Sequence, residues 1–149
     1  MEIMDNCGPA SRKPRPIAGR GIVRIAAVSW TILLLTLLLA PLPSFPGQPR
    51  NLDRAVHFLL FFVETVLLFA VQAGTAARPP RRLIRALTGA AMLAVGTEVV
   101  QGVLPYRSLQ PSDLGMDFLG SLSASLPLYV GYALRREQRH EPRGSQAPH

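Results

Sequence analysis

The chain has 149 residues, of which 48% are hydrophobic and 17% charged, with a formal net charge of +7 and a mean hydropathy of +0.23. Charged residues are absent from long central stretches and gather at the two ends and in one connecting segment, which excludes an ordinary soluble domain and indicates a membrane protein. Because the basic residues flank the apolar stretches, they predict topology and contact with anionic headgroups rather than nucleic-acid binding.

The first 21 residues are rich in Pro, Gly and Arg and lack apolar periodicity, so we predict a disordered basic tail over 1–21. An uncharged run from Ile25 to Ala40 follows, and with its flanks it predicts a first membrane span over about 22–43. A cleavable signal peptide is the alternative interpretation. A cut after Ala40 would place Leu38 where a small residue is preferred, so we expect an uncleaved anchor.

Three further apolar stretches predict membrane spans at about 55–77, 83–104 and 114–134. Prolines and a glycine between Ser44 and Asn51 predict a loop before the second span, and Arg78-Pro79-Pro80-Arg81-Arg82 predicts a basic loop after it. The polar residues 135–149 predict a disordered C-terminal tail. The expected architecture is an all-α, integral membrane four-helix bundle formed by one domain, residues 22–134.

Thirteen of the sixteen Lys and Arg residues lie on one side of the membrane if the four spans alternate in direction. The positive-inside rule assigns that side to the cytoplasm. We therefore expect both chain termini in the cytoplasm and the protein in the inner, cytoplasmic membrane.

Several polar side chains then fall in the outer half of the spans, inside apolar runs. A charge near the bilayer centre costs at least ~2.5–3.5 kcal/mol, so such residues indicate internal pairing, a water-filled cavity or chemistry. Helical spacing places them on shared faces, as for Asp113, Asp117 and Gly120 on the fourth span. The candidate site residues are Asp53, Arg54, His57, Glu98, Gln101, Arg107, Asp113 and Asp117.

These residues also form an ordered motif set, which consists of Asp53 and Arg54 before His57-Phe58, Glu98 with Gln101, Pro105 with Arg107, and Asp113 with position 117 and Gly120. The set resembles the VanZ-like family over about 30–134. The resemblance implies a small multi-pass membrane protein of the cell envelope, and the founding type of that family is associated with resistance to the glycopeptide teicoplanin. Two residues depart from the family pattern, because Asp117 stands where Asn is usual and Glu64 is not expected.

Each candidate has a functional and a structural interpretation. Glu98 acts as an acid, a base or a proton carrier with His57 as its partner, or it is a carboxyl that ties helices together. Arg107 holds an anionic group of a ligand, or it pairs with Asp113 or Asp117.

For Asp53 a helix cap is the favoured structural role, and Asp113 allows the same reading. Beside Glu98 and His57, the predicted acid and base, the remaining six site residues are predicted to bind a ligand. Glu64 and Gln72 are expected to form interhelical hydrogen bonds.

We predict no metal site and no cofactor, because one core histidine among carboxylates is not a zinc signature and no phosphate-binding glycine loop is present. The leading hypothesis is an envelope protein that alters how glycopeptides or cell-surface precursors are presented. Its expected partners are membrane lipids, lipid-linked envelope precursors or the antibiotic. The alternatives are an intramembrane enzyme acting on a lipid-linked substrate, a structural or partner-binding bundle, and a proton-coupled carrier.

Overall fold

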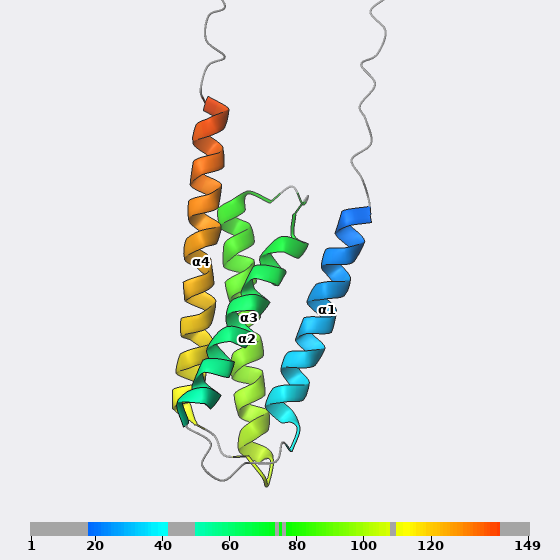
Figure 1. The fold of residues 1–149 in the computed structure, drawn as a ribbon, viewed down its shortest axis with the longest axis vertical. Helices are drawn as coiled ribbons and strands as arrows, with labels where there is room; N and C mark the ends of the chain where they lie inside the picture. Colours follow the sequence, from blue (N-terminus) through cyan, green and yellow to red (C-terminus); the bar gives the residue numbers. More distant parts are fainter. Residues whose placement is uncertain (1–17, 42–49, 74, 76, 108–109, 141–149) are drawn as a thin grey trace, which may run out of the picture.

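The computed structural model describes residues 18–41, 50–73, 75, 77–107 and 110–140, and these residues form four helices that alternate in direction (Figure 1). The helices are α1 (Ala18–Leu39), α2 (Arg50–Val71), α3 (Pro79–Val103) and α4 (Pro111–His140). Helices α2 and α3 contact each other, α1 packs on both of them, and α4 packs on both from the other side. The predicted all-α four-helix bundle is confirmed.

Helix α3 begins earlier than the sequence predicted. The basic segment that was expected to form a loop is helical from Pro79 onward, so that part of the loop prediction is wrong. Proline is accepted in a first helical turn because the N–H it lacks would have no partner inside the helix. Pro79 and Pro80 occupy these positions after Arg78, whose backbone is extended with φ −62° and ψ 147°.

The bounds of α2 and α4 also differ from the predicted spans. Helix α2 runs from Arg50 to Val71 rather than over 55–77, which places Asp53 in its first turn, where a carboxylate suits the helix dipole. Helix α4 continues to His140, beyond the predicted boundary at 134, through residues that include the good helix formers Arg, Glu and Gln. Of the predicted N-terminal tail, residues 1–17 lie outside the described part, and α1 begins at Ala18.

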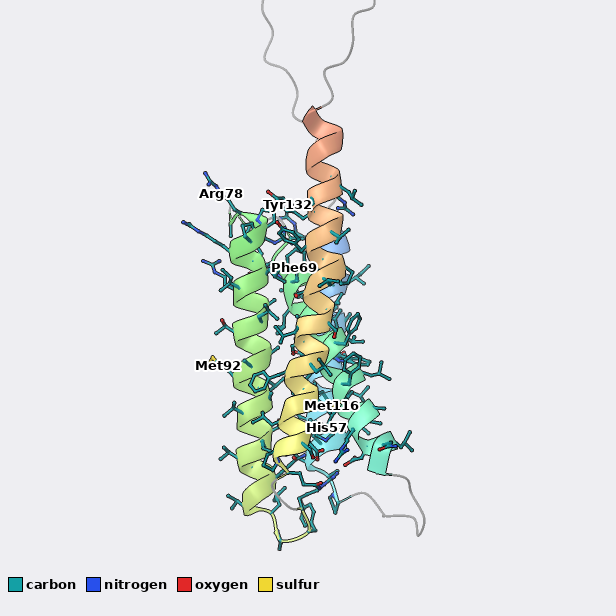
Figure 2. All side chains as sticks on the ribbon, turned by 90° about the vertical axis from the view of Figure 1, so that its left-hand side faces the viewer. His57, Phe69, Arg78, Met92, Met116 and Tyr132 are labelled. Carbon is teal, nitrogen blue, oxygen red and sulfur yellow. The ribbon has the colours of Figure 1, made fainter. Side chains whose placement is uncertain are left out.

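The apolar core lies where α1, α2 and α3 meet. Leucines of α1 and α2 and the ring of Phe61 pack there against two alanines of α3. Many other large apolar side chains point outward, as Met92 does on α3 with 72% of its surface exposed (Figure 2). The core cluster is formed by Leu34, Leu38, Leu60, Phe61, Ala90 and Ala94.

Three helices are long and apolar enough, by length and composition, to cross a membrane: Gly19–Leu39, Asn51–Val71 and Pro79–Val103. Their outward-facing apolar side chains suit a lipid environment. The chain is therefore a small multi-span helical membrane protein. Helix α4 is not among the three, since its serines, glycines and aspartates lower its hydropathy.

The two ends of the bundle differ in chemistry. The start of α1, the end of α2, the start of α3 and the end of α4 share one end (Figure 1). We call it the basic end, because it contains the described arginines Arg20, Arg24, Arg78, Arg81, Arg82, Arg85 and Arg135. The opposite end contains His57 and most of the predicted site residues, and we call it the cluster end (Figure 2).

Candidate functional site

A histidine–aspartate pair joins α2 to α4 at the cluster end. His57 Nδ1 lies 2.9 Å from Asp117 Oδ1, and both residues are almost fully buried, with 2% and 1% of their surfaces exposed. With its proton on Nδ1, the imidazole donates a hydrogen bond to the carboxylate. That contact orients the ring and leaves Nε2 as the nitrogen available to a further partner.

Gly120 allows this pair to form. A Cβ atom at Gly120 would lie 3.0 Å from the carbonyl carbon of Phe58 and closer still to its oxygen, so any larger residue meets the α2 backbone. Phe58 follows His57 directly, and Gly120 is one helical turn beyond Asp117 on the same face. Because Gly120 has no side chain, α4 can approach α2 closely enough for His57 and Asp117 to form their hydrogen bond.

Glu98 is buried on α3 and holds the segment that leads into α4. One of its carboxylate oxygens accepts a hydrogen bond of 2.5 Å from the backbone N–H of Gln110, which precedes the first residue of α4. Glu98 is also close enough to His57, Asp113 and Asp117 to interact with them electrostatically. The predicted acid–base pairing of Glu98 with His57 is not seen as a hydrogen bond in the described residues, where Asp117 is the partner of His57.

Gln101 and Arg107 bind the end of α1 instead of one another or the aspartates. The amide of Gln101 donates to the Leu38 carbonyl at 2.8 Å, and Arg107 Nη2 lies 3.2 Å from the Leu37 carbonyl oxygen. The last carbonyls of a helix have no partner inside it and carry partial negative charge, so a cation and an amide satisfy them. Among the described residues Arg107 forms no ion pair, so the alternative in which it pairs with Asp113 or Asp117 is not observed.

The remaining predicted residues lie at the rim of the cluster. Asp113 is buried in the first turn of α4 and accepts a hydrogen bond of 3.2 Å from the Ser112 hydroxyl. Asp53 is half-buried, whereas Arg54 is exposed on α2. The structure thus brings seven of the eight predicted residues to one end of the bundle in partly or fully buried positions, and it leaves Arg54 on the surface.

Three of these residues have the geometry to hold a metal ion. Asp53, His57 and Asp113 each offer one ligand atom, and these atoms lie within 4.8 Å of one another. Two carboxylates and one imidazole suit a hard or borderline divalent cation. A metal-binding histidine usually donates its other ring N–H to a carboxylate or carbonyl, and the hydrogen bond from His57 to Asp117 has that form. The sequence prediction of no metal site did not anticipate this grouping, because Asp53 and Asp113 are 60 positions apart.

Glu64 lies apart from the cluster, in the contact between α2 and α1. Its Oε1 is 3.0 Å from the Thr31 hydroxyl, which also lies 2.9 Å from the Ala27 carbonyl oxygen of its own helix. The expected interhelical hydrogen bond of Glu64 is confirmed, as is that of Gln72, whose amide donates to the Arg82 carbonyl at 3.2 Å. Glu64 therefore has a structural partner on α1.

Replacing Thr31 with valine should reduce the stability of the bundle. The change removes a hydroxyl and leaves the buried Glu64 carboxyl without its partner on α1, at a cost of about 1 kcal/mol for a hydrogen bond between membrane helices. The measurement is thermal unfolding of the purified protein in detergent, followed by circular dichroism. Thr36→Val is the matched control, because the Thr36 hydroxyl is exposed and bonds the Ile32 carbonyl of its own helix. Equal melting shifts for both variants would contradict a role for the interhelical bond.

Sequence reasoning missed the partners rather than the site residues. The acceptors of Gln101 and Arg107 are backbone carbonyls, and the donor to Glu98 is a backbone N–H. These partners cannot be predicted from residue type. Tyr106 was also missed, although its hydroxyl donates to the Leu39 carbonyl at 3.1 Å. Its position between Pro105 and Arg107 in the predicted motif was the only available signal.

Comparisons with protein-family models, with curated proteins and with solved structures found no match to this chain.

Proposed function

We propose that this chain is a four-span, VanZ-like protein of the inner membrane, with both termini in the cytoplasm and the cluster end facing outward. The arginines at the basic end support this orientation, because positively charged segments are retained in the cytoplasm. Membrane crossing by α4 is part of the proposal. It is supported by the extensive packing of α4 along α2, which is itself apolar enough to span.

The proposed activity is a change in how glycopeptides or cell-surface precursors are presented at the outer face. One observation carries it: seven residues of the motif set, spread from Asp53 to Asp117, come together at one end of the bundle. Residues placed only for solubility would stay on exposed faces. A partly or fully buried group of carboxylates, an imidazole, an amide and a guanidinium is instead suited to bind polar groups of a peptide or a lipid-linked sugar.

An intramembrane enzyme acting on a lipid-linked substrate is the second candidate, favoured by the His57–Asp117 pair. A carboxylate that bonds Nδ1 directs the basic Nε2 nitrogen toward a substrate, which is the arrangement of a general base. Under this hypothesis Asp117 replaces Glu98 as the residue that assists His57. Glu98 then keeps the start of α4 in place through Gln110.

A structural or partner-binding bundle is the third candidate, and a different observation favours it. Three side chains bond backbone atoms of other segments: Glu98 bonds the residue before α4, and Gln101 and Arg107 bond the end of α1. If these hydrogen bonds serve only to fix the positions of the helices relative to one another, the polar residues need no ligand or reaction to account for them.

Survival of a teicoplanin-sensitive host tests the leading proposal. The host should express wild type, Glu98→Gln or Glu98→Ala at matched membrane levels. We expect wild type to protect and Glu98→Ala to lose protection. The alanine leaves the Gln110 N–H without its acceptor, which should destabilise the start of α4 beside the cluster by about 1–3 kcal/mol. No protection by well-inserted wild type would overturn the antibiotic association.

Glu98→Gln tests whether ionisation of Glu98 is needed, because its amide oxygen can still accept the hydrogen bond from Gln110. Full protection by this variant removes any role for ionisation of Glu98 and agrees with a role in holding the start of α4. Loss of protection, in a variant that inserts and melts like wild type, favours proton transfer at this position.

A further inference from the structure

A cavity of about 670 Å³ lies at the basic end, between α2, α3 and α4. Figure 2 shows Phe69 and Tyr132, which line it, close together near the start of α3 and far from His57. Arg82 of α3 and Arg135 of α4 contribute the charged part of the wall. The cavity therefore has no residue in common with the cluster end.

Among the described residues, its wall combines two arginines with apolar and aromatic surface and contains no acidic residue. The Arg82 guanidinium lies 4.5 Å from the centre of the Phe69 ring and donates to the Phe69 carbonyl at 3.1 Å. These contacts fix its position. A guanidinium carries five N–H donors, and the Phe69 carbonyl accepts from only one of its terminal nitrogens. A guanidinium fixed in this way is suited to an anionic oxygen.

We propose that this cavity binds the headgroup of an anionic phospholipid. The phosphodiester would be held by Arg82 and Arg135, and the apolar wall formed by Pro127 and Leu128 of α4 would contact the glycerol and the start of the acyl chains. Basic pockets between membrane helices on the cytoplasmic side bind anionic headgroups. A zwitterionic lipid has the same phosphodiester but no net negative charge, because its ammonium group balances it. The proposal rests on membrane insertion with the basic end at a leaflet surface and not on the activity of the cluster end.

Gly131 provides a way to fill the cavity without changing its charge. Gly131 lines the wall, and a Cβ atom at this position would meet nothing within 4 Å. A leucine there would enter the open volume without displacing backbone. Gly96 of α3 is the matched control, because it is exposed, has equal open space around it and does not line the cavity.

Native mass spectrometry of the full chain in detergent, mixed with dioleoyl phosphatidylglycerol or dioleoyl phosphatidylcholine, measures the binding. We expect wild type to retain phosphatidylglycerol preferentially. Gly131→Leu should abolish this preference while Gly96→Leu keeps it. Arg135→Gln should weaken it about fivefold, as expected for about 1 kcal/mol per arginine near an anionic surface. Arg81→Gln is the charge-matched control, because Arg81 is exposed and lies outside the cavity wall.

Arg82→Gln should have the largest effect among the charge variants. Arg135→Gln removes no hydrogen bond or ion pair seen within the described residues, so it keeps the test valid if Arg82→Gln fails to fold. Equal retention of the two lipids by wild type would overturn the proposal. So would equal weakening by Arg81→Gln and Arg135→Gln, since this would indicate general charge attraction. Displacement of the lipid by excess inorganic phosphate would likewise overturn it, in favour of a site for a free anion.

Discussion

Gly120→Ala is expected to separate α2 from α4 and to destabilise the protein by about 3 kcal/mol or more, at the upper end of the usual cost of overpacking. The added methyl group would overlap the carbonyl group of Phe58, which is backbone and cannot turn aside as a side chain can. Relief requires movement of a whole helix along the most extensive contact in the bundle. Thermal unfolding in detergent measures the loss, and proteolysis of isolated membranes reports whether α4 still packs.

Gly115→Ala is the control for this substitution. Gly115 lies on the same helix, yet a Cβ atom there would meet nothing within 4 Å. Alanine has the higher helix propensity, so the control should be neutral or stabilise the helix by up to about 1 kcal/mol. If Gly120→Ala melts as Gly115→Ala does, the close approach of α4 to Phe58 is not a feature of the folded protein.

Asp117→Ala is expected to cost about 3–5 kcal/mol, the usual effect of removing one partner from a buried pair. His57 would keep a buried ring nitrogen without its 2.9 Å partner, and the space of the carboxylate would be left open. Asp117→Asn should lower the free energy of unfolding far less, because the amide oxygen can still accept the hydrogen bond from the Nδ1–H group. The free energy of unfolding by denaturant in mixed micelles measures both variants.

A double-mutant cycle with His57→Ala isolates the interaction between the two side chains. We expect the double variant to be little less stable than Asp117→Ala alone, because the second change removes the group that the first left without a partner. Additive losses would show that the two residues act independently. A loss in Asp117→Asn as large as that in Asp117→Ala would assign the stability to the charge of the carboxylate rather than to its hydrogen bond.

The sequence predicted the helices and their buried faces well, because both follow from local rules. Apolar runs of membrane length predicted the number and type of elements. Helical spacing placed Asp113, Asp117 and Gly120 on one face of the fourth span, and all three are buried. Helix bounds were less accurate, since prolines were read as ending structure when two of them begin α3.

The pairing of the candidate site could not be predicted from the sequence. Pairing with an aspartate was one of the two roles considered for Arg107, because opposite charges attract. The structure places it instead at the end of α1, where Ala40 and Leu37 offer carbonyl oxygens. Every residue has a backbone carbonyl, so the sequence contains no pattern that identifies which one accepts the hydrogen bond. The choice of Asp117 over Glu98 as the partner of His57 depends on the separation of α2 and α4, which is set by a backbone contact.

The long sequence separation of the His57–Asp117 pair has a consequence for biosynthesis. Asp117 is made 60 residues after His57, a delay of roughly 3–12 s at translation rates of about 5–20 residues per second. During that interval the imidazole of His57 has no Asp117 to bond, whereas Glu64 can already bond Thr31 of the earlier α1. Water or lipid headgroups therefore have to satisfy His57 first, and they are displaced when α4 packs on α2.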